Sequence, residues 1–234
     1  MDYWEPKIVS MYRTVFSSFL ALVLWGCSQG STPLPYYNTP DFMPLFINDP
    51  ALVPNQIKHS IDPFEVTDQH DQKITREYLE GKVHVANFMF TRCTSICPVM
   101  TNNLKSLASI YENHPRFSIL SFSVTPWMDS VPALQSFAES YGIKAKNWHL
   151  LTGEKSEIYR LARRSYFAEK DLGFTKDSTE FLHTEHLVLV DTKLRLRGIY
   201  NATLKPEILQ LQQDGARHAH LQAVRLLPAR GGAA

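Results

Sequence analysis

The sequence has no surplus of charge of either sign. Its 234 residues carry 24 Lys and Arg against 23 Asp and Glu, so the formal net charge is +1. Because proteins that bind phosphate backbones need a strong basic surplus, this balance argues against a nucleic-acid-binding protein. Nothing in the composition indicates disorder, and with 44% hydrophobic residues the chain can bury one sizeable core. We expect a single domain with flanking segments.

The N-terminus also lacks a hydrophobic run long enough for a comfortable transmembrane helix. Its apolar run covers 15–25, the length of the hydrophobic region of a signal peptide, and follows Arg13. The run leads into LWGC, which resembles a bacterial lipobox, where the cysteine becomes the lipidated first residue of the mature protein. We therefore expect 1–27 to be a signal peptide, with Cys27 anchoring a lipoprotein to a membrane of the bacterial cell envelope. A leader with a stray cysteine or an uncleaved anchor is the alternative.

Cysteine is scarce, with three in the chain. If lipid modifies Cys27, then Cys93 and Cys97 remain as a closed pair in an oxidising compartment. Both lie in FTRCTSICPVM with three residues between them. At this spacing in a helix the sulfurs lie roughly 5–6 Å apart, whereas a disulfide needs about 2 Å and a metal can bridge the wider gap at about 2.3 Å from each thiolate. The spacing favours a metal site or a redox pair over an inert disulfide.

The pattern of apolar residues divides the rest of the chain. Residues 28–57 are rich in Pro, Ser and Asn and predict a flexible tether. From 58 to 213, strand-like and helix-like segments alternate. We predict strands at 82–90, 116–124, 148–153, 186–191 and 194–201, helices at 98–114, 130–142, 154–166 and 205–213, and before them a hairpin at 63–75 and a helical turn at 75–81. This order predicts an α/β sandwich with a mixed central sheet and an N-terminal hairpin. The tail 214–234 gives no clear signal.

A strand, a cysteine pair and a helix that opens with Pro98 form the layout of a thioredoxin-like fold. Free amides at a helix N-terminus and the positive end of its dipole stabilise thiolate over thiol, which lowers the cysteine pKa. Such cysteines are the reactive and metal-binding kind.

Two thiolates need a further donor, and nine histidines are available. We expect His59, His70 and His114 to be solvated, and His84 and His149 to be satisfied residues within strands. His218 and His220 fall at the uncertain tail. His183 and His186 differ from these, because they lie in the loop that leads into a late strand. In a thioredoxin-like fold, that edge of the sheet faces the N-terminus of the first helix.

Three separated motifs of the sequence resemble those of one protein family. The stretches PFEVTDQHDQKIT with FTRCTSICPVM, SFSVTPWMDSVPALQSFAESYG and FLHTEHLVLVDTKLRLRGIYN are similar to the Sco/SenC family, thioredoxin-like copper proteins of cytochrome c oxidase assembly. The resemblance covers roughly 58–213. In the family, the ligand histidine lies eight residues before the aspartate that ends the strand. That register selects His183, eight before Asp191, over the extra imidazole of His186.

The resemblance implies that Cys93, Cys97 and His183 bind copper, Cu(I) or Cu(II), and deliver it to the binuclear copper centre of an oxidase subunit. The same cysteines, as a Cys93–Cys97 disulfide and dithiol pair, could instead reduce that subunit's disulfide, which requires a thiol reductant. Two thiolates and an imidazole are a soft donor set suited to copper. Asp129 resembles an acidic position of the family that supports the site or contacts a partner, although a solvated loop acid is the plainer interpretation.

Two other functions remain open. One is a membrane-tethered thiol-disulfide reductase or peroxidase, but such proteins usually place a cis-proline beside the active cysteine, and the sequence has no proline between Ser165 and Val190. The other is a structural zinc site, which three protein donors would leave incomplete. The missing proline and the incomplete zinc donor set therefore favour a copper-binding protein, which we expect to be a metallochaperone rather than an enzyme.

Overall fold

The computed structural model describes residues 33–112, 114–168 and 184–218. The predicted signal peptide with Cys27, the predicted ligand His183, and His220 lie outside the described residues. The chain from Leu34 onward belongs to one compact unit, which holds the predicted thiol pair.

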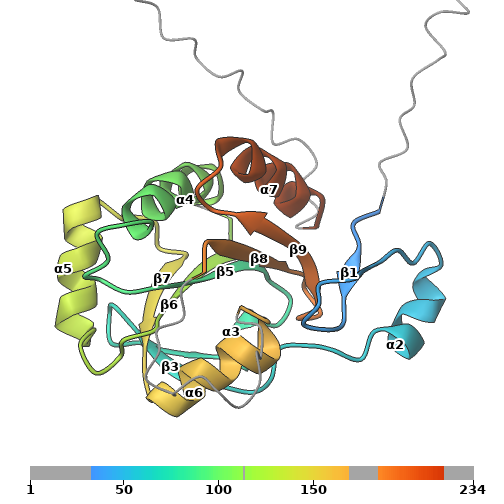
Figure 1. Cartoon of the computed structure of the whole chain (residues 1–234), viewed down its shortest axis with the longest axis horizontal. Coiled ribbons are helices and arrows are strands. Elements are labelled where there is room, and N and C mark those ends of the chain that lie inside the picture. The colour runs from blue at the N-terminus through green and yellow to red at the C-terminus, as the bar shows by residue number, and fades with distance from the viewer. Residues whose placement is uncertain (1–32, 113, 169–183, 219–234) are drawn as a thin grey trace, which may run out of the picture. The chain divides into compact units, whose positions relative to one another are not determined.

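The described strands form one mixed sheet in the order β2-β1-β9-β8-β5-β6-β7-β3-β4 (Figure 1). The strands are β1 (Tyr36–Tyr37), β2 (Pro44–Leu45), β3 (Glu65–Asp68), β4 (Lys73–Thr75), β5 (Val83–Met89), β6 (Phe117–Ser123), β7 (Trp148–Thr152), β8 (His186–Val190) and β9 (Leu196–Asn201). The central strands β5, β6 and β7 are parallel, whereas β8 runs antiparallel to β5 and β3 antiparallel to β7. The predicted mixed α/β fold with its β3–β4 hairpin is confirmed.

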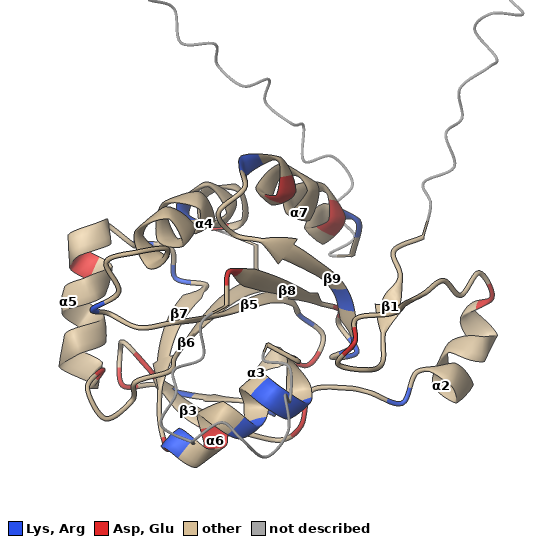
Figure 2. Ribbon diagram, in the orientation of Figure 1, with Lys and Arg blue, Asp and Glu red and all other residues tan. Residues whose placement is uncertain are grey.

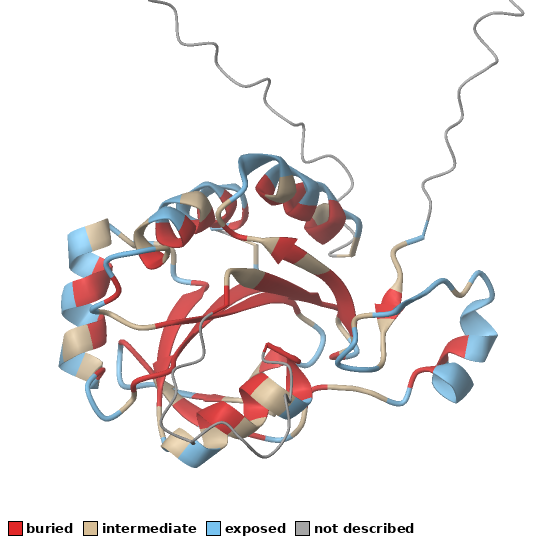
Figure 3. Ribbon diagram, viewed as in Figure 1, coloured by how far each residue is buried: buried red, intermediate tan, exposed pale blue. Residues whose placement is uncertain are grey.

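Helices cover both faces of this sheet, as Figure 1 shows. The helices are α2 (Val53–Gln56), α3 (Arg76–Leu79), α4 (Cys97–Tyr111), α5 (Val131–Tyr141), α6 (Lys155–Arg160) and α7 (Lys205–His218), with the 3-10 turn η1 (Pro50–Leu52) and the π-helical turn η2 (Leu161–Ser165). Apolar residues of α4, α5 and α7 share one buried cluster, and those of α3, α6 and η2 share the other. Strand β5 supplies Val85 to the first and Phe88 to the second, because successive strand residues point to opposite faces. Figure 3 shows the central strands in the colour of buried residues.

Helix boundaries follow local signals with one exception. Gly142 ends α5 in the left-handed conformation, with φ of +62°, which glycine adopts without steric cost. Thr75 caps α3 by accepting a hydrogen bond from Tyr78 N at 3.5 Å. Ser130 occupies the capping position of α5, but its side chain makes no capping bond. Pro98 is in the first turn of α4, which begins one residue earlier, at Cys97.

The prediction of a flexible tether at 28–57 is wrong for residues 34–57, which form short strands and helical turns. Tyr37 of β1 pairs with Leu196 of β9, and a small core forms around Tyr36, Val53 and Ile57. The buried guanidinium of Arg197 donates to Pro35 O at 2.9 Å and to Leu34 O at 2.6 Å. These elements are only two to four residues long, too short for periodicity to predict.

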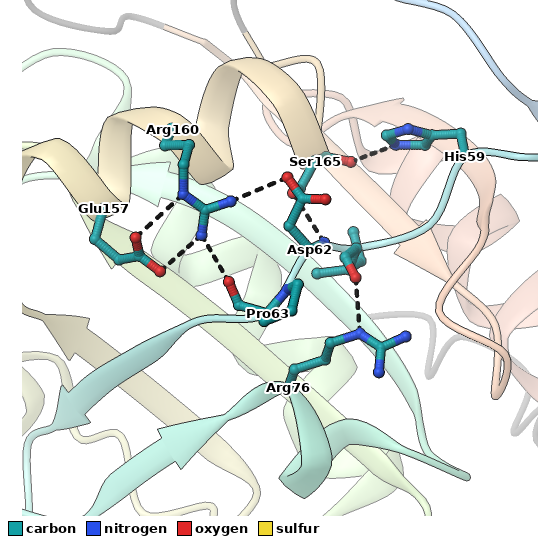
Figure 4. A network of polar contacts seen from close by, with 8 residues as sticks. His59, Asp62, Pro63, Arg76, Glu157, Arg160 and Ser165 are labelled. Atoms are coloured by element: carbon teal, nitrogen blue, oxygen red, sulfur yellow. Dashed lines mark hydrogen bonds and ion pairs between the residues drawn. The ribbon is translucent and has the colours of Figure 1, made fainter.

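The segment that follows is tied to α6 and η2 by polar contacts (Figure 4). His59 Nε2 lies 2.8 Å from Ser165 O, and Asp62 N donates to Ser165 Oγ at 3.1 Å. Arg160 donates to Asp62 at 3.0 Å. The ring of His59 also stacks on Phe167 with centroids 4.2 Å apart. The prediction that His59 is solvated is therefore wrong, because it bridges two elements distant in sequence.

The predicted boundary between helix and tail is also displaced. Helix α7 continues through 214–218 rather than ending at 213. Asp214 in that extension is buried and accepts a hydrogen bond from the Tyr200 hydroxyl at 2.8 Å. The sequence around Asp214 does not indicate this contact, because the partner Tyr200 comes from β9.

Candidate metal centre

The two thiols lie where the central strand β5 passes into α4. Cys93 N donates to Phe90 O at 3.2 Å and closes a turn directly after β5. Cys97 is the first residue of α4, and its amide donates to Cys93 Sγ at 3.5 Å. The thiols are 9% and 4% exposed. Both are free, so the structure shows the reduced pair and not the predicted Cys93–Cys97 disulfide, which stays a prediction for an oxidised form.

The helix terminus makes the two thiols unequal. Burial by itself would raise the pKa of Cys93, but hydrogen bonds from the Cys97 thiol and from the amides of Cys97, Ser95 and Ile96 outweigh burial and lower that pKa. Burial raises the pKa of Cys97 to about 12, and its bond to Cys93 adds to the rise. Cys93 is therefore the thiol that ionises first, as the position beside free helix amides predicts. The same expectation is wrong for Cys97, because burial outweighs the helix terminus there.

Asp129 holds the cysteine loop to the neighbouring loop between β6 and α5. Its carboxylate accepts from Thr91 N at 3.1 Å and Thr91 Oγ1 at 2.5 Å. It also accepts from Ser123 Oγ at 2.6 Å and Thr125 Oγ1 at 3.0 Å. Asp129 is 1% exposed, so the interpretation as a solvated acid is wrong. The carboxylate positions the loop two residues before Cys93, which agrees with a supporting position.

Sequence reasoning missed Thr91, Ser123 and Thr125 as partners of this carboxylate. The signal available was weak: Ser123 and Thr125 are polar residues at and just after the end of a strand that is otherwise largely apolar. Buried polar side chains need hydrogen-bond partners, so such residues indicate a buried acceptor without identifying it.

Strand β8 begins beside the carboxyl end of β5. Val188 pairs with Ala86, which places the start of β8 at the sheet edge that carries the cysteine loop (Figure 1). Glu185 O accepts from Ala202 N at 2.7 Å, and Ala202 O accepts from Asn103 Nδ2 of α4 at 2.8 Å. The chain just before β8 is thus connected to the helix that begins with Cys97.

His186, the first residue of β8, contacts an aromatic ring of the N-terminal segment. Its ring packs edge-on against Phe42, with centroids 6.0 Å apart. Among the described residues, no group of three His, Cys, Asp or Glu side chains is arranged to hold a metal ion. The donors present nevertheless fit a soft metal ion, because two thiols lie close together and the pKa of Cys93 is lowered.

The two strand histidines have structural roles. His84 lies on β5, is fully buried, and places Nε2 3.1 Å from the Tyr166 hydroxyl. His149 on β7 bridges Asp68 and the Tyr78 hydroxyl, both at 2.9 Å. His70 is exposed as predicted, and His114 is half-buried. None of these joins the thiol pair.

Comparisons with known proteins agree with this geometry. A model of the SCO1/SenC family matches residues 54–213. The SCO1 protein homolog of Bacillus subtilis is 34% identical over 118 residues, which are 50% of this chain and 61% of that protein. The chain thus spans less than two thirds of that relative's length.

Solved structures show the same fold. A SCO1/SenC family lipoprotein from Bacillus anthracis is 26% identical with a TM-score of 0.60, over 69% of this chain and 95% of that one. BsSco, described as a member of the Sco family of cytochrome c oxidase assembly proteins with a disulfide switch, is 28% identical with a TM-score of 0.58, over 70% and 95%. ScoI of Bradyrhizobium japonicum, solved with copper bound, is 22% identical with a TM-score of 0.53 over 68% and 99%, a likeness of fold alone. The SCO1/SenC family model matches more than half of the residues of this chain, so the chain belongs to the SCO1/SenC family.

Proposed function

We propose that this chain is a copper-binding protein that delivers copper to, or prepares the thiols of, the binuclear copper site of cytochrome c oxidase during assembly of the oxidase. The observation that carries the proposal is the reduced pair Cys93 and Cys97 at the N-terminus of α4. Family membership and the description of BsSco as an oxidase assembly protein support it.

Copper is the cargo that best fits the donor chemistry. Thiolates are soft ligands that select copper among biological metals, and imidazole suits it as well. We assign His183 as the third donor, because Thr184, the next residue, is buried just before β8, and β8 begins at the sheet edge of the cysteine loop. Three protein donors leave a coordination position through which a recipient could exchange ligands.

The proposed location is the outside of a bacterial membrane, with lipid on Cys27. The LWGC motif and the description of the Bacillus anthracis neighbour as a lipoprotein support this anchor. None of the helices in the described part of the chain combines the length and hydrophobicity of a membrane span.

The ligand set is tested by loading the reduced chain with Cu(I) and Cu(II). We expect one copper per chain, a thiolate-to-Cu(II) charge-transfer band, and loss of affinity of at least about 100-fold in His183→Ala, since losing even a supporting partner of a metal ligand costs about 10–100-fold. His186→Ala is the matched control and should retain affinity. Undiminished binding in His183→Ala would overturn the ligand assignment.

Thiol–disulfide exchange is the second candidate, favoured by the unequal pKa values of the two thiols. Cys93 thiolate would attack a substrate disulfide and release one substrate thiolate. This attack leaves a mixed disulfide between Cys93 and the substrate. Cys97 would then attack the mixed disulfide at the Cys93 sulfur, pass its proton to a substrate thiolate and release the second substrate thiolate. The products are a Cys93–Cys97 disulfide and a substrate reduced by two electrons. Efficient reduction of a disulfide by the chain, combined with unaltered copper binding in His183→Ala, would favour this function over metal delivery.

A further inference from the structure

Four large apolar side chains are exposed together near the beginning of the described chain. Met43 is 60%, Leu45 38%, Phe46 59% and Leu52 45% exposed. They lie on β2, beside it and on η1, at the edge of the sheet, and we call them the β2 patch. Figure 3 shows this region, between β1 and α2, largely in the colour of exposed residues. Scattered exposed apolar residues are ordinary, but a cluster within ten residues indicates a contact surface.

The β2 patch is held in place by the rest of the domain. Asn38 Oδ1 accepts from the amides of Lys58 and His59 at 3.1 and 2.9 Å, which closes the loop that carries the patch. Asp49 caps η1 by accepting from Ala51 N at 2.9 Å. These contacts fix the backbone on both sides of the patch, so its exposure is a property of the folded chain.

The charges around the patch favour an apolar occupant. Between Leu34 and Ile57 the only charged residues are Asp41 and Asp49 (Figure 2). Asp41 accepts from Thr39 Oγ1 at 2.5 Å and from Met43 N at 3.3 Å, and Asp49 caps η1, so each carboxylate is engaged locally. The neighbouring cations are engaged within the domain: Arg195 and Arg197 lie over the ring of Tyr36 and pair with Asp191, and Lys58 Nζ donates to Pro54 O. Electrostatic attraction to phosphate or to an acidic protein therefore does not explain the patch.

We propose that the β2 patch rests in the interface of the lipid bilayer. The inference rests on the lipid anchor at Cys27, which is part of the proposed function. Cys27 and Leu34 are seven residues apart in the sequence, and an extended chain of that length spans at most about 25 Å. This reach is less than the roughly 30 Å thickness of the hydrocarbon core. The anchor therefore keeps the first folded residues near the bilayer surface, where exposed Phe, Leu and Met side chains partition.

Photolabelling in native membranes tests the patch. The full chain is produced in a bacterium that lipidates proteins, its membranes are loaded with a phosphatidylcholine that carries a diazirine in the acyl chain, and labelled peptides are identified by mass spectrometry. We expect label in peptides covering 41–53 and little in those covering α7. The double variant Met43→Ser with Phe46→Ser should lower that label by roughly tenfold. Leu209→Ser, at a residue of α7 that is 55% exposed, is the matched control and should leave it unchanged.

The same preparation separates failure of the anchor from failure of the patch. Acylated Cys27 with no label in 41–53 overturns the patch and leaves the anchor in place. An unmodified Cys27 with label in 41–53 overturns the anchor and supports the patch. Absence of both overturns both. Cross-links between two copies through 41–53, without lipid label, would show that a second copy covers the patch and would overturn the proposal.

Discussion

Replacing Asp129 should weaken the domain at the cysteine loop. Its carboxylate accepts hydrogen bonds from Thr91, Ser123 and Thr125 while being 1% exposed. A hydrogen bond to a charged group contributes about 1.5–3 kcal/mol, and a buried donor left without a partner costs about 1–3 kcal/mol. These contributions are not additive, because hydroxyl groups can rotate to other acceptors. For Asp129→Ala we expect a loss of about 3–5 kcal/mol in the free energy of unfolding.

Urea-induced unfolding, followed by tryptophan fluorescence, measures this loss. Asp62→Ala is the matched control, because the Asp62 carboxylate also accepts a hydrogen bond, from Arg160, but both side chains are partly exposed, at 44% and 30%. Such a pair contributes about 1 kcal/mol or less. Asp129→Asn keeps the size of the side chain but replaces one acceptor oxygen with a donor, so its loss should fall between those of the two alanine variants.

The reasoning is refuted if Asp129→Ala and Asp62→Ala lose the same free energy of unfolding. That result would mean that water or a shifted loop satisfies the donors around Asp129 at little cost. It would also remove the argument that this carboxylate fixes the loop before Cys93.

Two further predictions concern other buried groups. Burial lowers the pKa of His84 to about 3, and the Asp191 carboxylate offsets only part of this effect. The folded pKa lies below the unfolded value of 6.5, so the contribution of neutral His84 to the free energy of unfolding is fully present above pH 6.5. This contribution falls by roughly 4 kcal/mol as the pH drops to about 3. Urea unfolding at several pH values measures the fall, and a His84→Gln variant whose free energy of unfolding depends on pH as strongly as that of the unsubstituted chain would contradict the prediction. Arg197→Lys should lose about 1–3 kcal/mol in the free energy of unfolding and speed proteolysis between 34 and 57, because lysine lacks the planar fork that reaches two carbonyls. Arg195→Lys is the control, because Arg195 is 21% exposed and bonds to Asp191 instead of these carbonyls. Equal proteolysis rates in the two variants would count against the prediction.

Local signals were sufficient for the fold and for the thiol pair. The run 82–90 is nearly continuous in apolar residues because β5 is covered on both faces. Pro98 followed by helical periodicity located the start of α4 within one residue, but placed its end at 114, three residues beyond Tyr111. Cysteines between a strand and a helix are placed by chain connectivity alone, so their position beside free amides could be predicted. The hairpin at 63–75 was predictable for the same reason, because adjacent strands joined by a polar turn pair with each other.

Contacts between distant segments could not be predicted in this way. His59 and Ser165 are 106 residues apart, and nothing near His59 in the sequence indicates a partner. The segment 34–57 contains many prolines and no periodicity, as a linker would, yet its short elements are held by Arg197 from β9. One sequence shows which residues are polar, but burial decides whether a polar residue is a solvated group or a structural contact.

The buried contacts fix the two loops to which we assign the metal ligands. A ligand set drawn from two loops is precise only if each loop is fixed to the rigid sheet and helices, since small displacements of a ligand weaken binding. Asp129 fixes the loop that leads to Cys93 by bonding both the amide and the hydroxyl of Thr91. Asn103 of α4 fixes the other side through Ala202, whose amide in turn reaches Glu185. Asp129 fixes the loop before Cys93 to the end of β6, and Asn103 fixes the chain after β9 to α4. The loop that carries the thiols and the chain before β8 are therefore both bonded to the rigid elements of the domain.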